Sequence, residues 1–444
     1  MKGNQIIGLL IGALSIGFYY HGSIASDAVP AKPQDHPIAL VDVTIHSMTG
    51  PVIAKGTVLF DRGKIVAVGE AVSIPAGTEK IQFANKHVYP GLIDACTCIG
   101  LVEIGAVSAT VDTAETGSIN PNVRAEVAIN PESEIIPVTR ANGVTCALTV
   151  PRGGLISGTS ALIMLDGWTW EDMLLKAPVG LHLIWPSMTI RRVPGIKLSE
   201  EEQRRKRDRQ IKELREAFSQ AKSYRIAREA QLPSGGTNLP IDLRWEAMIP
   251  VLQRKIPVFI YADEARQINA VVTWAEQENV KLVVAGGQDS WRVADLLREK
   301  NIPVILMPIL RTPMRDWEGY DTPFSAAARL SQKGVRFCIA GDGGASNERN
   351  LPYHAAMAAG FGLAKEEALK AITLYPAQIL GVADRIGSLE PGKDATFIVT
   401  DGDPLEIVTR VERVFIQGKD VDLRNKHTML YDKYTEKYRR LSKP

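Results

Sequence analysis

Cysteine is scarce in this sequence, with four residues among 444, and so is an excess of charge of either sign. Four cysteines are too few for the disulfide framework of a small secreted scaffold. The 52 basic and 50 acidic residues leave a net charge of +2, a balance that gives no electrostatic footprint for nucleic acid. The 45% hydrophobic and 23% charged residues are ordinary for a globular protein and exclude disorder, collagen and coiled coil as whole-chain structures.

Long hydrophobic runs are rare as well, and the run near the N-terminus is short for a membrane span. Residues 6–20 are uncharged and mostly apolar, Lys2 precedes them, and the small residues Ser23 and Ala25 follow. This order is typical of a secretory signal peptide, whereas a membrane span needs about 20 apolar residues. We therefore predict a signal peptide over 1–25 and an exported, periplasmic mature chain without a membrane span. An uncleaved anchor is the alternative.

The remaining chain begins and ends with strand-rich segments. Residues 26–37 are a Pro-rich linker, and β-branched or alternating runs follow over 38–87 and again over 384–421. The stretch 61–64 reads as a hairpin turn. Short strand sets need partners to bury a core. We therefore predict one small composite β-sandwich built from both chain ends, followed by a charged C-terminal tail over 422–444.

Between residues 88 and 383 the pattern changes to apolar runs that alternate with helical segments. Strands that alternate with helices are typical of a parallel sheet, and eight such strands close a (β/α)8 barrel. We therefore predict an α/β fold with a TIM-like (β/α)8 barrel over 88–383. The predicted strands lie in VYPGLIDACT, VTCALTV, SALIML, VGLHLIW, IPVFIYA, VKLVVAGG, IPVILMP and VRFCIAG.

One long charged segment, residues 199–230, interrupts the barrel pattern. Ser199 and Glu202 have the spacing of a capping box, and a narrow apolar stripe follows at helical spacing. The segment predicts a long helix, either a solvated crossover between strands or a lid. The stripe consists of Ile211, Leu214, Phe218 and Ala221.

Three stretches resemble the amidohydrolase superfamily, and most closely its imidazolonepropionase-like branch. VYPGLIDACTCIG at 88–100 is similar to the first barrel strand of that family, and VRFCIAGDGG at 335–344 is similar to its eighth strand. Residues 366–405 are similar to its closing stretch. The resemblance implies a (β/α)8 barrel with a composite sandwich. It also implies metal-assisted hydrolysis of C–N bonds by ligands at the carboxyl ends of the strands.

The residues at the implied ligand positions depart from the family pattern. The family has a His-x-His pair on strand one and His on strands five and six, but this chain has Cys96, Cys98, Tyr261 and Gly286 there. Strand four offers no Lys, and only Asp342, on strand eight, keeps the family identity. We therefore expect that the usual two-metal site does not form.

Two thiols and a carboxylate remain as candidate metal ligands. Cys96 and Cys98 share a face with Asp94 in an extended strand, and thiolates favour zinc. With Asp342 they predict at most one zinc ion, and a site without metal is the alternative. The cysteines alternatively serve as small packing residues or pair as a disulfide.

Asp342 is the predicted catalytic residue. A carboxylate at a strand end can act as a general base, although Asp also caps turns such as GDGG. Candidate substrate-binding residues near other strand ends are Arg152, His182, Tyr261 and Asp263. The alternative for His182 is an interior histidine. For the others the alternative is a solvated loop.

Two functions follow from these residues. The first is an amidohydrolase-family hydrolase that acts on non-peptide C–N bonds of a small molecule, such as a cyclic amide, with a reduced metal site. The second is a non-hydrolytic binding protein or pseudo-enzyme on the same scaffold. The family resemblance favours the first, and the lost ligands favour the second.

Overall fold

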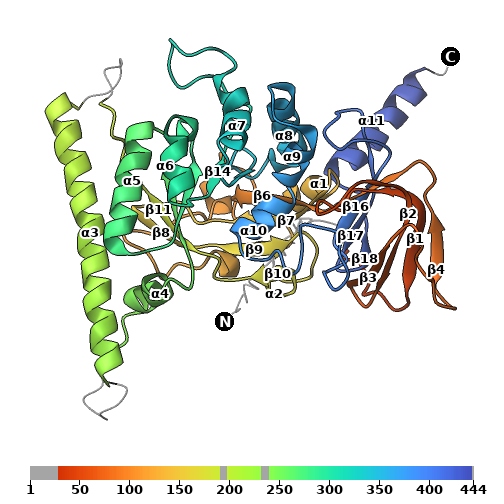
Figure 1. Cartoon of the computed structure of the whole chain (residues 1–444), viewed down its shortest axis with the longest axis horizontal. Helices are drawn as coiled ribbons and strands as arrows, with labels where there is room; N and C mark the ends of the chain where they lie inside the picture. The colour runs from red at the N-terminus through yellow and green to blue at the C-terminus, as the bar shows by residue number, and fades with distance from the viewer. Residues whose placement is uncertain (1–28, 191–197, 232–239, 443–444) are drawn as a thin grey trace, which may run out of the picture.

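The computed structural model describes residues 29–190, 198–231 and 240–442, which form three β-sheets and their flanking helices (Figure 1). The predicted signal peptide over 1–25 lies outside the described residues and stays a prediction. None of the helices in the described ranges is long and apolar enough to span a membrane.

Both ends of the described chain contribute strands to one eight-stranded sheet, at the right of Figure 1. The order is β18-β17-β16-β5-β1-β2-β3, and β4 also pairs with β1. The two ends meet where β5 pairs antiparallel with β16. Whether these strands divide into the two layers of the predicted sandwich stays a prediction. The strands are β1 (Ile38–Ile45), β2 (Ile53–Asp61), β3 (Lys64–Gly69), β4 (Glu79–Gln82), β5 (His87–Pro90), β16 (Phe397–Thr400), β17 (Val411–Ile416) and β18 (Lys419–Val421).

Three phenylalanines from both chain ends form the centre of this sheet's core. Phe60 contacts Phe397 and Phe415 with ring centroids 5.2 Å apart in each pair, and all three rings are fully buried. Such aromatic pairs add about 0.5–1.5 kcal/mol each beyond their burial. Lys64 also reaches Asp394 at 2.5 Å. The first and last segments of the described chain therefore stabilise one another.

The predicted hairpin turn at 61–64 is confirmed. Asp61 pairs with Lys64 across the turn. The two central residues, Arg62 and Gly63, have φ angles of 48° and 75°. Positive φ at both positions is typical of the type I′ turn, whose twist matches that of the flanking strands.

The other strands form a four-stranded sheet, β10-β9-β7-β6, and a six-stranded sheet, β15-β14-β13-β12-β11-β8. Within them β6 pairs in parallel with β7, and β11 to β15 pair in parallel in chain order. The strands of these two sheets are β6 (Leu92–Thr97), β7 (Val144–Thr149), β8 (Ile156–Thr159), β9 (Ala161–Met164), β10 (Leu174–Lys176), β11 (Leu181–Ile184), β12 (Val258–Ala262), β13 (Leu282–Gly286), β14 (Val304–Leu306) and β15 (Phe337–Ile339). Eight of them lie in runs that the sequence predicted, but β8 and β10 lie outside those runs and were not predicted.

The third predicted strand, SALIML at 160–165, is wrong as a parallel strand. It forms β9, which pairs antiparallel with β7. A parallel partner needs a crossover of a dozen or more residues, usually with a helix, and residues 150–160 contain no helix. No ladder joins β6 to β15 in the described ranges, so closure into a barrel stays a prediction.

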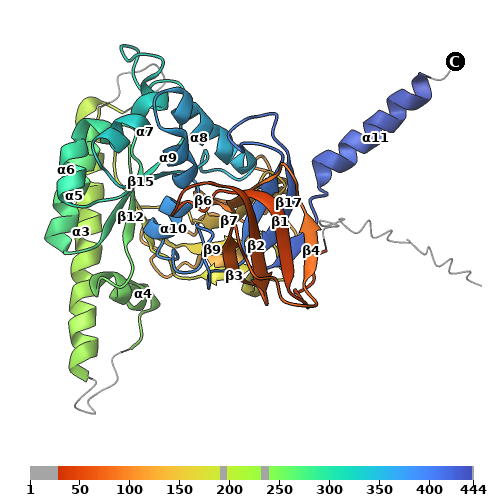
Figure 2. The same cartoon turned by 45° about the vertical axis from the view of Figure 1, so that its right-hand side comes forward.

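The helices flank these two sheets, and α11 projects from the fold (Figure 2). No residue of α11 is buried, in agreement with a charged tail. The helices are α1 (Ile135–Arg140), α2 (Trp170–Met173), α3 (Glu200–Gln231), α4 (Leu243–Leu252), α5 (Ala265–Glu278), α6 (Ala294–Glu299), α7 (Thr322–Gln332), α8 (Leu351–Gly360), α9 (Lys365–Lys370), α10 (Leu374–Ile379) and α11 (Lys426–Leu441).

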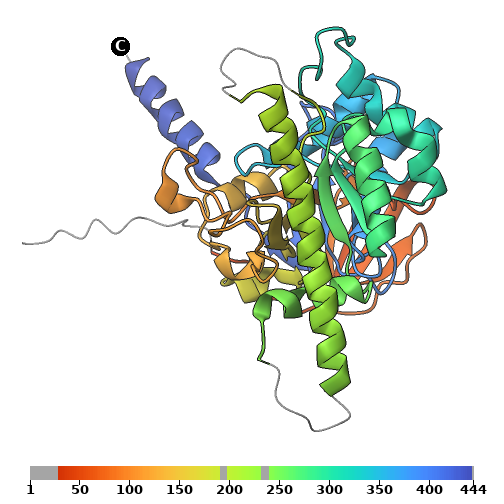
Figure 3. The same cartoon turned by 90° about the vertical axis from the view of Figure 1, so that its left-hand side faces the viewer.

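The long helix predicted over 199–230 is confirmed as α3, which runs along one side of the molecule (Figure 3). The capping box forms, because Glu202 N–H donates to Ser199 Oγ and Ser199 N–H donates to Glu202 Oε2. The apolar stripe is buried at Leu214 and Phe218, and Phe218 packs edge-on against Trp274 of α5. The helix is therefore a packed part of the fold.

Candidate active site

Four residues predicted from the sequence form one contact cluster. Cys96, Arg152 and Tyr261 lie at or just after the carboxyl ends of β6, β7 and β12, whereas His182 lies inside β11. The Tyr261 hydroxyl lies 3.1 Å from the Cys96 thiol and 3.3 Å from His182 Nδ1. Arg152 Nη2 lies 4.0 Å from the same thiol, and its guanidinium carbon lies 5.8 Å from the centroid of the Tyr261 ring. The structure therefore brings Arg152, His182 and Tyr261 together around Cys96.

Arg152 is the charged member of this cluster and has no carboxylate partner among the residues that the structure describes. It makes no ion pair in the described parts of the chain, and its buried Nε has no hydrogen-bond acceptor. Burial raises the pKa of the Cys96 thiol, although Arg152 acts in the opposite direction. Burial also raises the pKa of Tyr261 well above its usual value. At neutral pH the guanidinium is therefore surrounded by neutral groups and remains free to attract an anion.

His182 is the innermost member of the cluster. Its ring is buried and stacks on Phe259 at a centroid distance of 4.8 Å. Burial, together with the positive charge of Arg152, lowers the pKa of His182 to about 3. Its Nε2 has no hydrogen-bond partner within the described segments of the chain. His182 is therefore a neutral interior histidine that orients the Tyr261 hydroxyl.

Asp342 follows β15 and is exposed. Its carboxylate accepts hydrogen bonds from Gly344 N at 2.8 Å and from Asn347 Nδ2 at 2.9 Å, so it caps its own turn. Burial acts to raise its pKa, but these hydrogen bonds hold the pKa below its usual range. Asp342 is therefore an ionised carboxylate that solvent can reach.

The turn that contains Asp342 lies next to Arg152. A Cβ atom added at Gly343 would overlap Arg152 Nη2, so this glycine allows the guanidinium to approach the backbone. The same turn is tied to the end of β6, because Cys98 N–H and the Thr97 hydroxyl both donate to the Gly344 carbonyl. The carboxylate and the guanidinium thus sit at the same end of the strands.

The donor set at this position does not fit a divalent metal ion. Cys98 Sγ lies 3.8 Å from the Val150 carbonyl, and burial raises the pKa of Cys98 to about 11. The guanidinium beside Cys96 repels a second cation. The described residues contain no group of three or more His, Cys, Asp or Glu side chains that could hold a metal. The zinc ion predicted at Cys96, Cys98 and Asp342 therefore has no support in this geometry.

The disulfide alternative for the cysteines is wrong, because Cys96 and Cys98 are both free thiols. Cys96 contacts Tyr261 and Cys98 contacts a backbone carbonyl, so the two side chains have separate neighbours. Both are almost completely buried. The interpretation as small packing residues agrees with these contacts.

The sequence analysis missed a pair of buried carboxyl groups beneath Asp342. A Cβ atom at Gly341 would overlap Glu348 Oε2 and would lie 2.9 Å from Asp94 Oδ2, so both groups crowd one point. Both side chains are fully buried. Burial, together with the Asp94 carboxyl group, raises the pKa of Glu348 well above its usual value. One of the two is therefore protonated at neutral pH. In the sequence, the only indication of this pair is an acidic residue six positions after Asp342.

Asp263 lies outside the Arg152 cluster. A Cβ atom at Gly286 would lie 2.5 Å from Asp263 Oδ1, so this carboxylate takes the space of a side chain on β13. Burial raises the pKa of Asp263. No hydrogen bond or ion pair connects it to Arg152 within the described ranges. Asp263 therefore packs against the end of β13 and is not a member of the Arg152 cluster.

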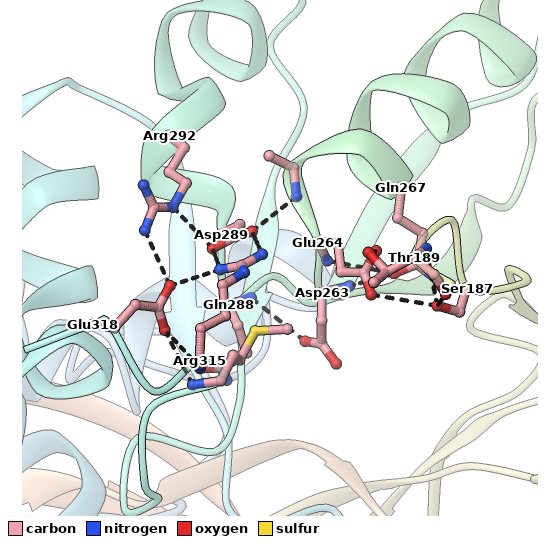
Figure 4. A network of polar contacts seen from close by, with 12 residues as sticks. Ser187, Thr189, Asp263, Glu264, Gln267, Gln288, Asp289, Arg292, Arg315 and Glu318 are labelled. Atoms are coloured by element: carbon pink, nitrogen blue, oxygen red, sulfur yellow. Dashed lines mark hydrogen bonds and ion pairs between the residues drawn. The ribbon is translucent and has the colours of Figure 1, made fainter. Parts of the chain in front are cut away.

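A network of ion pairs borders Asp263 and was also missed (Figure 4). Asp289 pairs with Arg315 at 2.5 Å and with Arg292 at 3.0 Å, and Glu318 pairs with both arginines. The Asp289 and Glu318 side chains are nearly fully buried. The network fastens the loop after β14 to the loop after β13. Nothing in the sequence pattern distinguishes these loop charges from exposed ones.

Comparisons with known proteins agree with the resemblance in the sequence. The pattern of the amidohydrolase family matches residues 321–421. The crystal structure of an amidohydrolase from Thermotoga maritima superimposes with a TM-score of 0.79 at 31% identity, covering 87% of this chain and all of that one. Amidohydrolase tasK from Hapsidospora irregularis is 23% identical over 399 residues, which is 82% of this chain but only 39% of tasK. An imidazolonepropionase from Syntrophobacter fumaroxidans is 32% identical over 109 residues, 24% of each chain. The chain belongs to the amidohydrolase family.

Proposed function

We propose that this chain is a hydrolase that cleaves a non-peptide C–N bond, such as that of a cyclic amide, in a small molecule. The observation that carries the proposal is the unpaired guanidinium of Arg152 beside the turn of the exposed carboxylate Asp342. A base and a cation at one strand end are what amide hydrolysis requires. Similarity to proteins named amidohydrolase and imidazolonepropionase supports the reaction class.

In the proposed reaction, Asp342 accepts a proton from water while the water oxygen bonds to the carbonyl carbon. Arg152 stabilises the negative charge that develops on the carbonyl oxygen. The C–N bond then breaks, and the departing nitrogen takes the proton from Asp342. No step passes through a metal, because the donor set does not fit one. Since hydrogen bonds lower the pKa of Asp342, it is a weak base, and we expect slow turnover.

Asp342→Asn tests the base directly. Asparagine retains an oxygen that can accept from Gly344 N–H, so the turn should persist while the basic oxygen is lost. We expect turnover of a panel of cyclic amides, N-acyl amino acids and dipeptides to fall at least a hundredfold. Asn347→Ala is the matched control, because it removes one hydrogen bond to Asp342 and should only move the pH profile upward. Turnover unchanged by Asp342→Asn would contradict the proposal.

The second candidate is a small-molecule binding protein without hydrolytic activity. The hydrogen-bonded series Cys96–Tyr261–His182 favours it, because Cys96 and Tyr261 occupy two positions where the resemblance implies metal ligands. Saturable binding of a panel compound without turnover, lost in Arg152→Gln, would select this candidate.

The remaining predictions join the same proposal. The four-stranded and six-stranded sheets would close as the family's (β/α)8 barrel, and the eight-stranded sheet would form its composite sandwich. The mature chain would be periplasmic and would begin at Ser26 or Val29. N-terminal sequencing that finds Met1 on soluble cytoplasmic protein would contradict export.

A further inference from the structure

A separate cavity lies at the opposite end of the parallel strands. It has a volume of about 750 Å³, within the usual range of ligand sites, about 300–1,000 Å³. Its lining includes the four residues that directly precede β12, β13, β14 and β15. These are Pro257, Lys281, Pro303 and Arg336. These mark the amino ends of the strands. Asp342 and Arg152 mark the carboxyl ends, so the cavity is distinct from the candidate active site.

The lining of this cavity is strongly basic. One acidic residue, Glu276, lines it, and this residue pairs with Lys300 at 2.7 Å. The other five cations have no carboxylate partner in the described ranges, although the whole chain has a net charge of only +2. The basic residues are Lys176, Arg254, Lys255, Lys281, Lys300 and Arg336.

Two of these cations are held in place by backbone carbonyl oxygens. Lys176 Nζ donates to the carbonyls of Leu380 and Gly381 at 2.9 and 3.1 Å. Arg336 Nη2 donates to the Asn301 carbonyl at 2.6 Å. Neutral acceptors fix the position of a cation without cancelling its charge. Binding of a ligand would therefore cost less side-chain conformational entropy, because these side chains are already held in place.

Arg254 lies in the turn between α4 and β12 with a φ angle of 58°, a left-handed conformation that commonly ends a helix and that recurs at Asn279 and Asn301 after α5 and α6. Its Nη1 donates to Asn279 Oδ1 at 2.9 Å. The side chain thus joins two neighbouring helix-to-strand turns and directs a guanidinium to the cavity wall.

A purely structural explanation covers part of these observations. Helices α4, α5 and α6 end near this face, and cations near helix C-termini stabilise the helix dipole by about 0.3–1 kcal/mol. That effect accounts for single lysines. It does not account for a hollow between them with an apolar floor. The floor consists of Ile256, Val272, Val280, Leu282, Ile302 and Ile379.

We propose that this cavity binds a small soluble molecule with a compact apolar body and at least two phosphate groups. The apolar floor accommodates the body. Cations from four different turns line the cavity, so a ligand with two or more anionic groups could pair with more of them than a ligand with one. Arg and Lys are the side chains that bind phosphate in charge-assisted hydrogen bonds. This site does not depend on the proposed hydrolysis.

Binding of inorganic triphosphate to the full chain tests the proposal by calorimetry at constant ionic strength. The double variant Lys255→Ala/Lys281→Ala removes two exposed cations that make no hydrogen bond or ion pair in the described ranges, so folding should be unaffected. We expect saturable binding by the parent and at least tenfold weaker binding by this variant. The matched control Lys80→Ala/Lys206→Ala removes the same charge from exposed positions elsewhere and should stay within twofold of the parent.

Three results would overturn the proposal. The first is the absence of saturable triphosphate binding. The second is equal weakening by the control pair or by Arg152→Gln, which would place the anion elsewhere. The third is binding only to phosphatidylglycerol vesicles and not to triphosphate, which would assign the cations to a lipid surface.

Discussion

Arg152→Met and Arg140→Met form a matched pair of perturbations, because both arginines are shielded but only Arg140 has a carboxylate partner. Arg140 Nη1 lies 3.0 Å from Asp166 Oδ1, and the two side chains are 4% and 0% exposed. Arg152 has no ion pair in the described ranges and faces neutral thiols and a phenol. The same substitution therefore has opposite consequences at the two positions.

The structure sets the size of each effect. Arg140→Met leaves the buried Asp166 carboxylate without its cationic partner, with the Ala31 N–H as a remaining donor. We therefore expect the free energy of unfolding to fall by about 3–5 kcal/mol. Arg152→Met leaves no carboxylate unpaired, so we expect the free energy of unfolding to change by less than about 1 kcal/mol in either direction. On activity we expect Arg152→Met to lower kcat by about 10²–10³-fold, the usual cost of removing one group that stabilises an oxyanion.

Urea unfolding followed by circular dichroism measures the first quantity, and turnover of an amide substrate measures the second. The two readouts separate a functional cation from a structural one. If Arg152→Met destabilised the fold as much as Arg140→Met while leaving kcat unchanged, the reasoning about an unpaired guanidinium would be refuted.

Two further predictions concern pH and the composite sheet. Lowering the pH from 7 to 5 should lower the free energy of unfolding by about 2 kcal/mol through His182. The pKa of His182 is about 3 in the folded chain and 6.5 in the unfolded chain. The unfolded chain therefore binds the proton first, and stability is lost as the pH falls between these values. Urea titrations at both pH values should show a smaller loss for His182→Gln, and an equal loss would contradict the assignment. Phe397→Ala should lower the free energy of unfolding by about 3–5 kcal/mol, because it opens the core shared with Phe60 and Phe415. The exposed Tyr431→Ala serves as control, and equal effects would mean that the two chain ends do not share a core.

The parts of the fold that could be predicted are those with a local signal. The Asp61–Lys64 turn and the stripe at Leu214 and Phe218 follow from turn chemistry and helical spacing. The antiparallel pairing of β9 could not be predicted, because an apolar run has the same composition in either direction.

The candidate site was predictable only in part. Strand ends placed Arg152 and Tyr261 near one another, since parallel strands end at the same edge of a sheet. The Asp94–Glu348 pair depends on the missing side chain of Gly341, which lets a residue seven positions later fold back against the strand. Such a close approach is set by tertiary packing and leaves no spacing pattern in the sequence.

The central claim is that Arg152 supplies the positive charge for hydrolysis at this site. The most direct measurement is kcat on an amide substrate with protein that has been stripped by a chelator and checked by elemental analysis, before and after zinc is added back. We expect turnover to persist without metal and to be lost in Arg152→Gln. Turnover that vanishes on chelation and returns in proportion to added zinc would contradict the account.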